Sequence, residues 1–207
     1  MLLIDHQSGL FQCINDMDFK RVRDHAIALA EAATLAGIPV ITTASVPQGP
    51  NGPLIPEIHQ AAPHAVYVPR RGEINSWDCP AFVEAVKKTG RKTLIIAGTV
   101  TSVCLAFPAI SAVRDGYKVF ALPDASGTYS KMAEEISLAR MVQAGVIPMD
   151  TSSAIAEIQQ TWHRDDWEKW ANIWARIFTN YGLLLESYAK AVEVTKTGEP
   201  MDSLRED

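Results

Sequence analysis

Short apolar runs alternate with longer segments of mixed polarity along the first three quarters of the chain. The runs are rich in leucine and β-branched residues and hold about four apolar residues each, as is typical of strands buried on both faces. Six such strands are expected, at Leu2–Asp5, Val40–Thr43, Ala65–Val68, Leu94–Ala97, Val119–Leu122 and Val146–Met149.

The segments between these runs have helical spacing. Four helices are expected, over Phe19–Ala36, Ala81–Thr89, Thr101 or Ser102 to Gly116, and Lys131–Ala144. Asp18 can cap the first, Pro80 suits the first turn of the second, and Pro108 predicts a kink or an irregular first turn in the third. Strands that alternate with helices form parallel sheets with right-handed crossovers. The sequence therefore predicts an α/β fold: a three-layer α/β/α, doubly wound, Rossmann-like domain whose six-stranded parallel sheet carries helices on both faces.

The pattern changes in the last quarter of the chain. Thr151–Tyr181 has helical spacing and four tryptophans, and a further helix is expected after Gly182, from Leu183 to about Val194. Thr195–Asp207 is polar and is expected to fray. Because no linker divides the chain, residues 1–207 are predicted to form a single domain with a helical C-terminal extension from about residue 151. The tryptophans could pack on the core or on another subunit, and the sequence leaves both open.

The composition excludes several classes of protein. The chain has 207 residues, a formal net charge of −5 and 47% hydrophobic residues, which is too apolar for a disordered chain and too acidic for a general nucleic-acid binder. No apolar run approaches the roughly 20 residues that span a bilayer, and Asp5 interrupts the apolar start before it could act as a signal sequence. Three widely spaced cysteines do not suggest a disulfide framework. We therefore expect a cytoplasmic protein with reduced thiols and with neither nucleic acid nor membrane as a partner.

Candidate chemistry gathers at the carboxyl ends of the predicted strands, where parallel sheets bind their ligands. Cys104 lies in the first turn of a predicted helix, whose free N–H groups and partial positive charge would lower the thiol pKa and stabilise an oxyanion. Asp5 ends the first expected strand, and Arg70 follows the third. Cysteine, carboxylate and cation at three strand ends would make a coherent nucleophilic site. Position alone leaves open a turn cap for Asp5 and a surface ion pair for Arg70.

Other side chains near these strand ends are interpreted as structural. Cys13 and Cys79 are expected to be small packing residues. His6 is expected to have a structural role. Asp124, which begins the segment Asp-Ala-Ser-Gly, is expected to form an Asx turn.

Five segments around these residues carry a resemblance to a known family. They are Leu3–Leu10, Gly49–Leu54, Arg71–Trp77, Ile96–Cys104 and Asp124–Thr128. Each fragment is weak alone, but their order and spacing together are specific. On these segments the sequence resembles the isochorismatase-like cysteine hydrolases, and within that superfamily the YcaC-type branch, from Leu2 to roughly Tyr181.

The resemblance implies a catalytic triad of aspartate, lysine and cysteine, matched here by Asp5, Arg70 and Cys104. Arginine at the lysine position departs from most of the superfamily, although the YcaC-type branch is similar in this respect. Arginine stays protonated, so it could hold the thiolate and the carboxylate electrostatically but could not shuttle a proton. The resemblance also implies a cis peptide bond at Val100–Thr101 and an oxyanion hole made by the backbone amides of Thr101 and Cys104.

The resemblance further implies that no metal or other cofactor is needed and that the chain forms a homo-oligomer, often an octamer in this branch. Nicotinamidase relatives bind a metal through an Asp-x-His motif and a further histidine after the second strand, whereas Ser45–Glu57 has no histidine and only one acid. The histidines, which are His6, His25, His59, His64 and His163, show no ligand spacing. Relatives usually carry a longer segment before the aspartate, so a truncated start and a naturally short one both stay open.

The favoured hypothesis is a cysteine hydrolase that cleaves a C–N bond of a small amide or related substrate through a thioester intermediate. Asn75, Trp77 and Phe107 are candidates for the wall of its substrate pocket, although packing explains each of them at least as well. The alternative is a non-catalytic oligomeric binding or assembly protein on the same fold. The third possibility is isochorismatase-type vinyl-ether hydrolysis. An intact Cys104 argues against it, because that relative works without a cysteine nucleophile.

Overall fold

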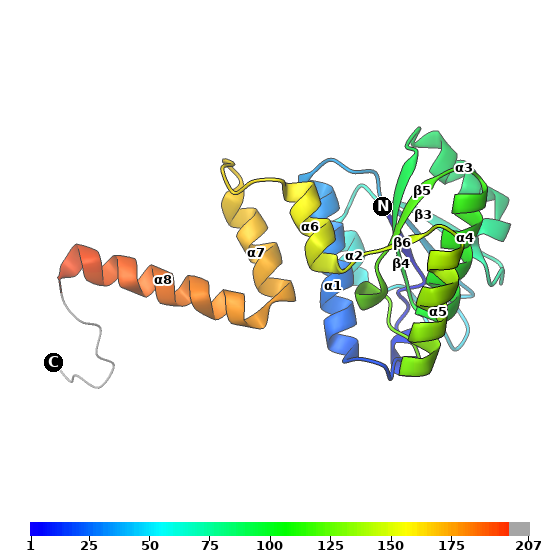
Figure 1. Cartoon of the computed structure of the whole chain (residues 1–207), viewed down its shortest axis with the longest axis horizontal. Coiled ribbons are helices and arrows are strands. Elements are labelled where there is room, and N and C mark those ends of the chain that lie inside the picture. Colours follow the sequence, from blue (N-terminus) through cyan, green and yellow to red (C-terminus); the bar gives the residue numbers. More distant parts are fainter. Residues whose placement is uncertain (199–207) are drawn as a thin grey trace.

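The chain folds around a six-stranded parallel sheet, seen in the computed structural model of Figure 1, which describes residues 1–198. The strands are β1 (Leu2–Ile4), β2 (Ile41–Ser45), β3 (Val66–Arg70), β4 (Thr93–Gly98), β5 (Lys118–Ala121) and β6 (Ile147–Pro148). Their order across the sheet is β3-β2-β1-β4-β5-β6, and all neighbouring strands run parallel. The chain builds outward from β1 to β3 and then returns to place β4 beside β1. The predicted doubly wound sheet is therefore confirmed, and its direction reverses between β1 and β4.

Helices cover both faces of this sheet (Figure 1). They are α1 (Phe19–Leu35), α2 (Pro56–Ala61), α3 (Pro80–Lys88), α4 (Ala106–Arg114), α5 (Lys131–Gln143), α6 (Thr151–Gln159), α7 (Trp167–Ile177) and α8 (Thr179–Thr197). One core cluster joins α1, α2 and α6 to the sheet and includes Leu3, while the other joins α3, α4 and α5 and includes Leu2 and Ile4. Successive residues of one strand therefore point into the cores on opposite faces of the sheet, which is why each strand is a continuous apolar run in the sequence.

Capping side chains begin α1 and α6, and the cap predicted at Asp18 is confirmed. The Asp18 carboxylate accepts a hydrogen bond from the Lys20 N–H (2.9 Å) at the start of α1. Asp150 accepts one from the Ser153 N–H (3.0 Å) at the start of α6. The irregular turn expected before α4 is present as a π-helical turn, Thr101–Leu105. These caps satisfy backbone donors that the first turn of a helix leaves free.

Several elements differ from expectation. α2 was not predicted, because six residues are too few to show a helical period. The long helix expected over Thr151–Tyr181 is broken into α6 and α7, with Gln160 at a positive φ of 64° after α6. Gly182 does not end a helix but lies inside α8. The part of the expected frayed tail from residue 199 onward lies outside the described residues.

The tryptophan-rich extension packs partly on the core. Trp170 is fully buried against α1, next to Ala28 and Ala32. Trp162 and Trp167 are nearly half exposed. No helix within residues 1–198 is long and apolar enough to cross a membrane.

Candidate active site

The strand order brings Asp5, Arg70 and Cys104 to the same edge of the sheet. Asp5 directly follows β1, Arg70 is the last residue of β3, and Cys104 lies in the π-helical turn after β4. All three are buried, with 1%, 4% and 8% of their surfaces exposed. β1 and β4 are neighbours at the reversal of strand order, which is the usual ligand site of such sheets.

Arg70 is held by acceptors on every side of its guanidinium group. Nη2 donates to Oδ1 of Asp5, and Nε donates to Oγ1 of Thr43 (3.1 Å). Nη1 donates to the backbone oxygens of Glu73 and Ile74. The Arg70 side chain is fully inaccessible, which excludes the surface ion pair considered from the sequence. Such a network fixes the cation in place next to the carboxylate.

The Cys104 thiol donates a hydrogen bond to the Asp5 carboxylate. Burial, the nearby negative charge of Asp5 and this hydrogen bond raise the pKa of the thiol well above its ordinary value of 9.0. The helix terminus was expected to lower the thiol pKa, and that expectation is wrong because burial and the charge of Asp5 raise the pKa. The resting group is therefore a thiol, and its activation requires a base.

Asp5 is placed to be that base. Burial raises the pKa of its carboxyl group, although the charge and the hydrogen bond of Arg70 oppose the rise. Its backbone has a positive φ of 56°, which is uncommon for a residue other than glycine, and its N–H donates to the Thr43 oxygen (3.0 Å). A carboxylate with a raised pKa accepts a proton more readily than an ordinary surface carboxylate.

The turn that carries Cys104 packs directly on the end of β4. A Cβ atom on Gly98 would lie 2.7 Å from the backbone oxygen of Cys104, so only glycine fits there. A cis peptide bond joins Thr99 to Val100, one residue earlier than the expected Val100–Thr101 bond. The π-helical form of the turn is common at functional sites.

The expected oxyanion-hole amides are engaged elsewhere. The Thr101 N–H donates to the Gly127 oxygen (2.7 Å), and the Cys104 N–H donates to the Val100 oxygen (2.9 Å). The backbone hydrogen bond that the Cys104 sulfur receives comes from Val100. The amide that faces the sulfur is therefore that of Val100 rather than Thr101.

The expected pocket-wall residues serve mainly in packing. The Trp77 indole N–H donates to Asp115 (2.8 Å), and the ring packs edge-on against Tyr117. Phe107 lies beneath the Arg140 guanidinium group at 5.0 Å, between α4 and α5. These contacts describe how the two aromatic side chains pack, and a pocket role for each of them stays a prediction.

Asn75 caps the short turn Ser76–Asp78. Its side chain accepts a hydrogen bond from the Trp77 N–H and donates one to Ser111 on α4. Asn75 directly follows Ile74, whose carbonyl oxygen contacts Arg70, so a pocket role for Asn75 stays a prediction.

Other structural assignments are mixed. Cys79 is buried as expected, whereas Cys13 is exposed. His6 is fully buried with Nε2 2.9 Å from the Ala125 oxygen, and burial lowers its pKa to about 4. Asp124 does not make the expected Asx turn. It accepts hydrogen bonds from the backbone and hydroxyl of Thr151 at the start of α6.

Sequence reasoning missed Thr43 and Gln7. Thr43 contacts both Arg70 and the Asp5 backbone, and its place near the end of the second strand was the available signal. The Gln7 amide donates to the backbone oxygens of Ser45 and Gly52 and accepts from the Ser45 N–H (3.0 Å). Gln7 therefore ties the loop after β2 to the catalytic edge.

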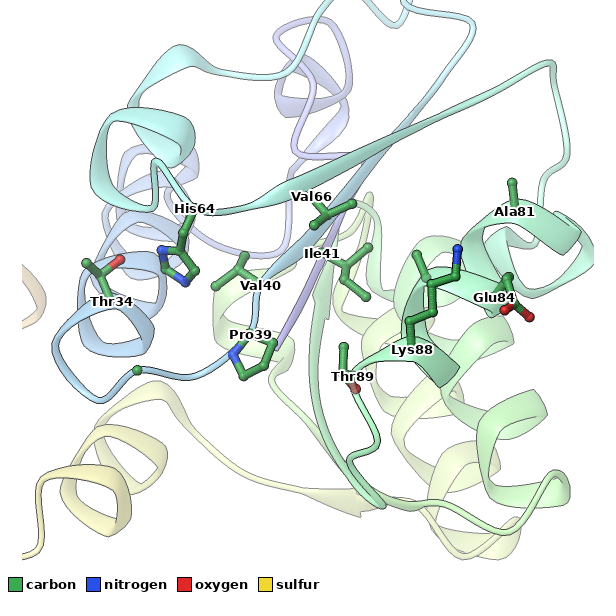
Figure 2. A pocket seen from close by; sticks show the side chains of 12 residues that line it. Thr34, Pro39, Val40, Ile41, His64, Val66, Ala81, Glu84, Lys88 and Thr89 are labelled. Carbon is green, nitrogen blue, oxygen red and sulfur yellow. The ribbon is translucent and has the colours of Figure 1, made fainter.

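Two further observations bear on ligands. Among residues 1–198, no group of three or more His, Cys, Asp or Glu side chains is placed to hold a metal ion. A cavity of about 710 Å³ lies at the opposite edge of the sheet, where β2 and β3 begin (Figure 2). Ile41, Val66 and Lys88 are among its lining residues, and none of the triad is. A strand of five residues spans roughly 13 Å, so this cavity is separate from Cys104.

The chain is similar to known proteins over most of its length. The isochorismatase domain matches residues 1–153. The probable hydrolase YcaC of Escherichia coli (strain K12) is 41% identical over 188 residues, which cover 91% of this chain and 90% of that protein.

Two solved structures have the same fold at 41% identity. YcaC from Escherichia coli, described as an octameric hydrolase of unknown specificity, has a TM-score of 0.87 and covers 92% of this chain and 93% of its own. YcaC from Pseudomonas aeruginosa, determined with hexane-2,5-diol and covalent acrylamide, has a TM-score of 0.86 and covers 91% of this chain and 93% of its own. The domain match, together with this identity, shows that the chain belongs to the isochorismatase family.

Proposed function

We propose that this protein is a cysteine hydrolase that cleaves the C–N bond of a small amide or related substrate. The observation that carries the proposal is the buried chain of contacts from the Cys104 thiol through the Asp5 carboxylate to the Arg70 guanidinium group. Nucleophile and base lie in hydrogen-bond contact, and a third group fixes the base.

In the first half of the reaction, the Cys104 sulfur attacks the carbonyl carbon while Asp5 accepts the thiol proton. A C–S bond forms, and the carbonyl oxygen takes up negative charge. Asp5 then delivers its proton to the nitrogen, the C–N bond breaks, and the amine leaves a thioester on Cys104. Arg70 stays protonated throughout and stabilises the carboxylate form of Asp5.

In the second half, water attacks the thioester carbon while Asp5 accepts a proton from it. The C–S bond breaks, the carboxylic acid leaves, and the proton returns to the sulfur. The amide of Val100 is the donor best placed to stabilise the oxyanion, because it already faces the Cys104 sulfur. No metal or organic cofactor enters these steps.

A relative supports a reactive nucleophile on this fold. The P. aeruginosa YcaC structure contains covalent acrylamide, and acrylamide adds to nucleophiles. In the present chain, Cys104 is the candidate for such a group. The proposal also includes a homo-oligomer, on the strength of the octameric E. coli relative, and a cytoplasmic location in which the three free cysteines stay reduced.

The test is a panel of small amides and carbamates, assayed with the wild type, Cys104→Ala and Cys79→Ala. Cys79 is also a buried cysteine but lies outside the triad, so it is a matched control. We expect Cys104→Ala to abolish turnover and Cys79→Ala to retain it. Turnover that survives Cys104→Ala would refute the mechanism. A panel without any turnover by the wild type would favour the non-catalytic assembly protein.

A further inference from the structure

Helix α8 projects away from the α/β body, as Figure 1 shows, and packs on its own chain mainly through α7. It has 19 residues, which corresponds to a length of about 28 Å. Helices in proteins gain most of their stability from packing an apolar face rather than from intrinsic propensity. Within residues 1–198, a helix of this length that packs mainly on α7 therefore lacks a partner along most of its surface.

One side of α8 is apolar. Tyr181, Leu184, Leu185, Tyr188 and Val192 recur at helical spacing and form what we call the α8 stripe. The stripe contains no charged residue. An ion pair between Glu186 and Lys190 (2.8 Å) lies on the opposite side of the helix. α8 thus carries an uncharged apolar stripe that does not face the sheet.

The stripe begins on an aromatic cluster and then continues without a partner. The Tyr181 ring lies 6.3 Å from the Trp162 ring, and Trp162 in turn lies 6.2 Å from Trp174. Farther along the same side, Leu184 is 61% exposed and Tyr188 is 68% exposed. The cluster and the stripe form one continuous apolar surface that ends in solvent, and aromatic residues are enriched at interfaces between proteins.

We propose that the α8 stripe is a subunit interface and that the same stripe of a second copy covers it, with the two α8 helices antiparallel about a twofold axis. This inference rests on the homo-oligomer of the proposed function. A stripe without charge can pair with itself without like-charge repulsion, and twofold contacts pair the same patch on both subunits. The octameric E. coli relative superposes on 92% of this chain, which favours a second copy over an unrelated partner.

Two neighbouring leucines give a matched test. Leu183 and Leu184 are both exposed, at 62% and 61%, but they lie on different sides of α8. We expect Leu184→Glu to raise the concentration at which the oligomer dissociates by at least about tenfold, because it places a charge in the interface. Leu183→Glu is expected to leave the wild-type mass, a multiple of 22.7 kDa, unchanged. Sedimentation velocity over a range of protein concentrations measures both, and thermal unfolding verifies that each variant is folded.

Different results would overturn the homo-oligomer and the α8 interface. A monomeric wild type at all concentrations would overturn both the homo-oligomer and the interface. An oligomeric wild type that Leu184→Glu and Tyr188→Ser leave intact would overturn the interface alone. Equal dissociation by the Leu183 and Leu184 variants would also overturn it.

Cross-linking tests the antiparallel pairing. Tyr188 is near the middle of the stripe, so twofold pairing brings its two copies close together. In a Cys13→Ser background, which removes the exposed native cysteine, Tyr188→Cys should form a disulfide-linked dimer under mild oxidation, and Leu183→Cys should not. Dissociation by Leu184→Glu without a cross-link at residue 188 would show that α8 docks on another surface of the second copy.

Discussion

Replacement of Arg70 by methionine tests the electrostatic core of the site. Both partners of the Arg70–Asp5 pair are inaccessible, with side-chain exposures of 0% and 2%. The variant leaves the Asp5 carboxylate buried without its cation, and breaking a buried pair from one side costs about 3–5 kcal/mol. Arg23→Met is the control, because the Arg23–Glu57 pair is about one-third exposed and is worth about 1 kcal/mol or less.

The loss in the free energy of unfolding caused by Arg70→Met should depend on pH. The direction of this dependence follows from the pKa of Asp5. Its folded pKa is already raised above the ordinary value of 3.8, and removal of Arg70 raises it further. The loss in Arg70→Met is therefore full above the folded pKa. It shrinks as the pH falls through that value, because the folded carboxyl takes up a proton before the unfolded one does.

Urea unfolding at matched protein concentration, from neutral to acidic pH, measures this loss for each variant. Adding Asp5→Asn to Arg70→Met should recover much of it, since the neutral amide no longer needs a cation. Equal losses for Arg70→Met and Arg23→Met would refute the reasoning, and so would a loss that neither acid nor Asp5→Asn reduces.

Three further predictions concern the parts around this pair. In a Cys13→Ser background, the rate of Cys104 alkylation by iodoacetamide should still rise with pH at pH 9.0, because burial and Asp5 raise the thiol pKa above that value. A rate that reaches its plateau at a lower pH would contradict this prediction. Gly98→Ala should destabilise the protein by about 1–3 kcal/mol in thermal unfolding, because its Cβ would collide with the Cys104 backbone; an unchanged melting temperature would argue against the close approach. Thr43→Val should lower the free energy of unfolding by about 1–3 kcal/mol and should lower turnover, because the Nε–H of Arg70 loses its acceptor. Thr43→Ser keeps the hydroxyl group and should retain both the stability and the turnover of the wild type.

The sheet, and the meeting of Asp5, Arg70 and Cys104 at one of its edges, could be predicted from the sequence because the signals for the strands are local. Each strand is an apolar run, and Asp5 directly follows such a run. Parallel topology then requires the carboxyl ends of the strands to share one edge, so residues far apart in sequence meet there.

The direction of the thiol pKa shift and the contacts of Trp77 could not be predicted in this way. A helix N-terminus is visible in sequence, but the burial that raises the thiol pKa of Cys104 comes from the packing of several strands and helices. Trp77 follows Arg70 closely in sequence, yet its indole N–H donates to Asp115, the residue that caps the C-terminal end of α4. Short elements such as α2 are missed because too few residues repeat.

Trapping of the acyl intermediate tests the central claim most directly. Hydroxylamine would be added during turnover of any amide that the wild type cleaves, because a thioester on Cys104 partitions between water and this stronger nucleophile. The account predicts a hydroxamate beside the carboxylic acid, and a peptide containing Cys104 that carries the acyl mass after acid quench. Hydrolysis that proceeds without hydroxamate and without an acyl group on Cys104 would contradict it.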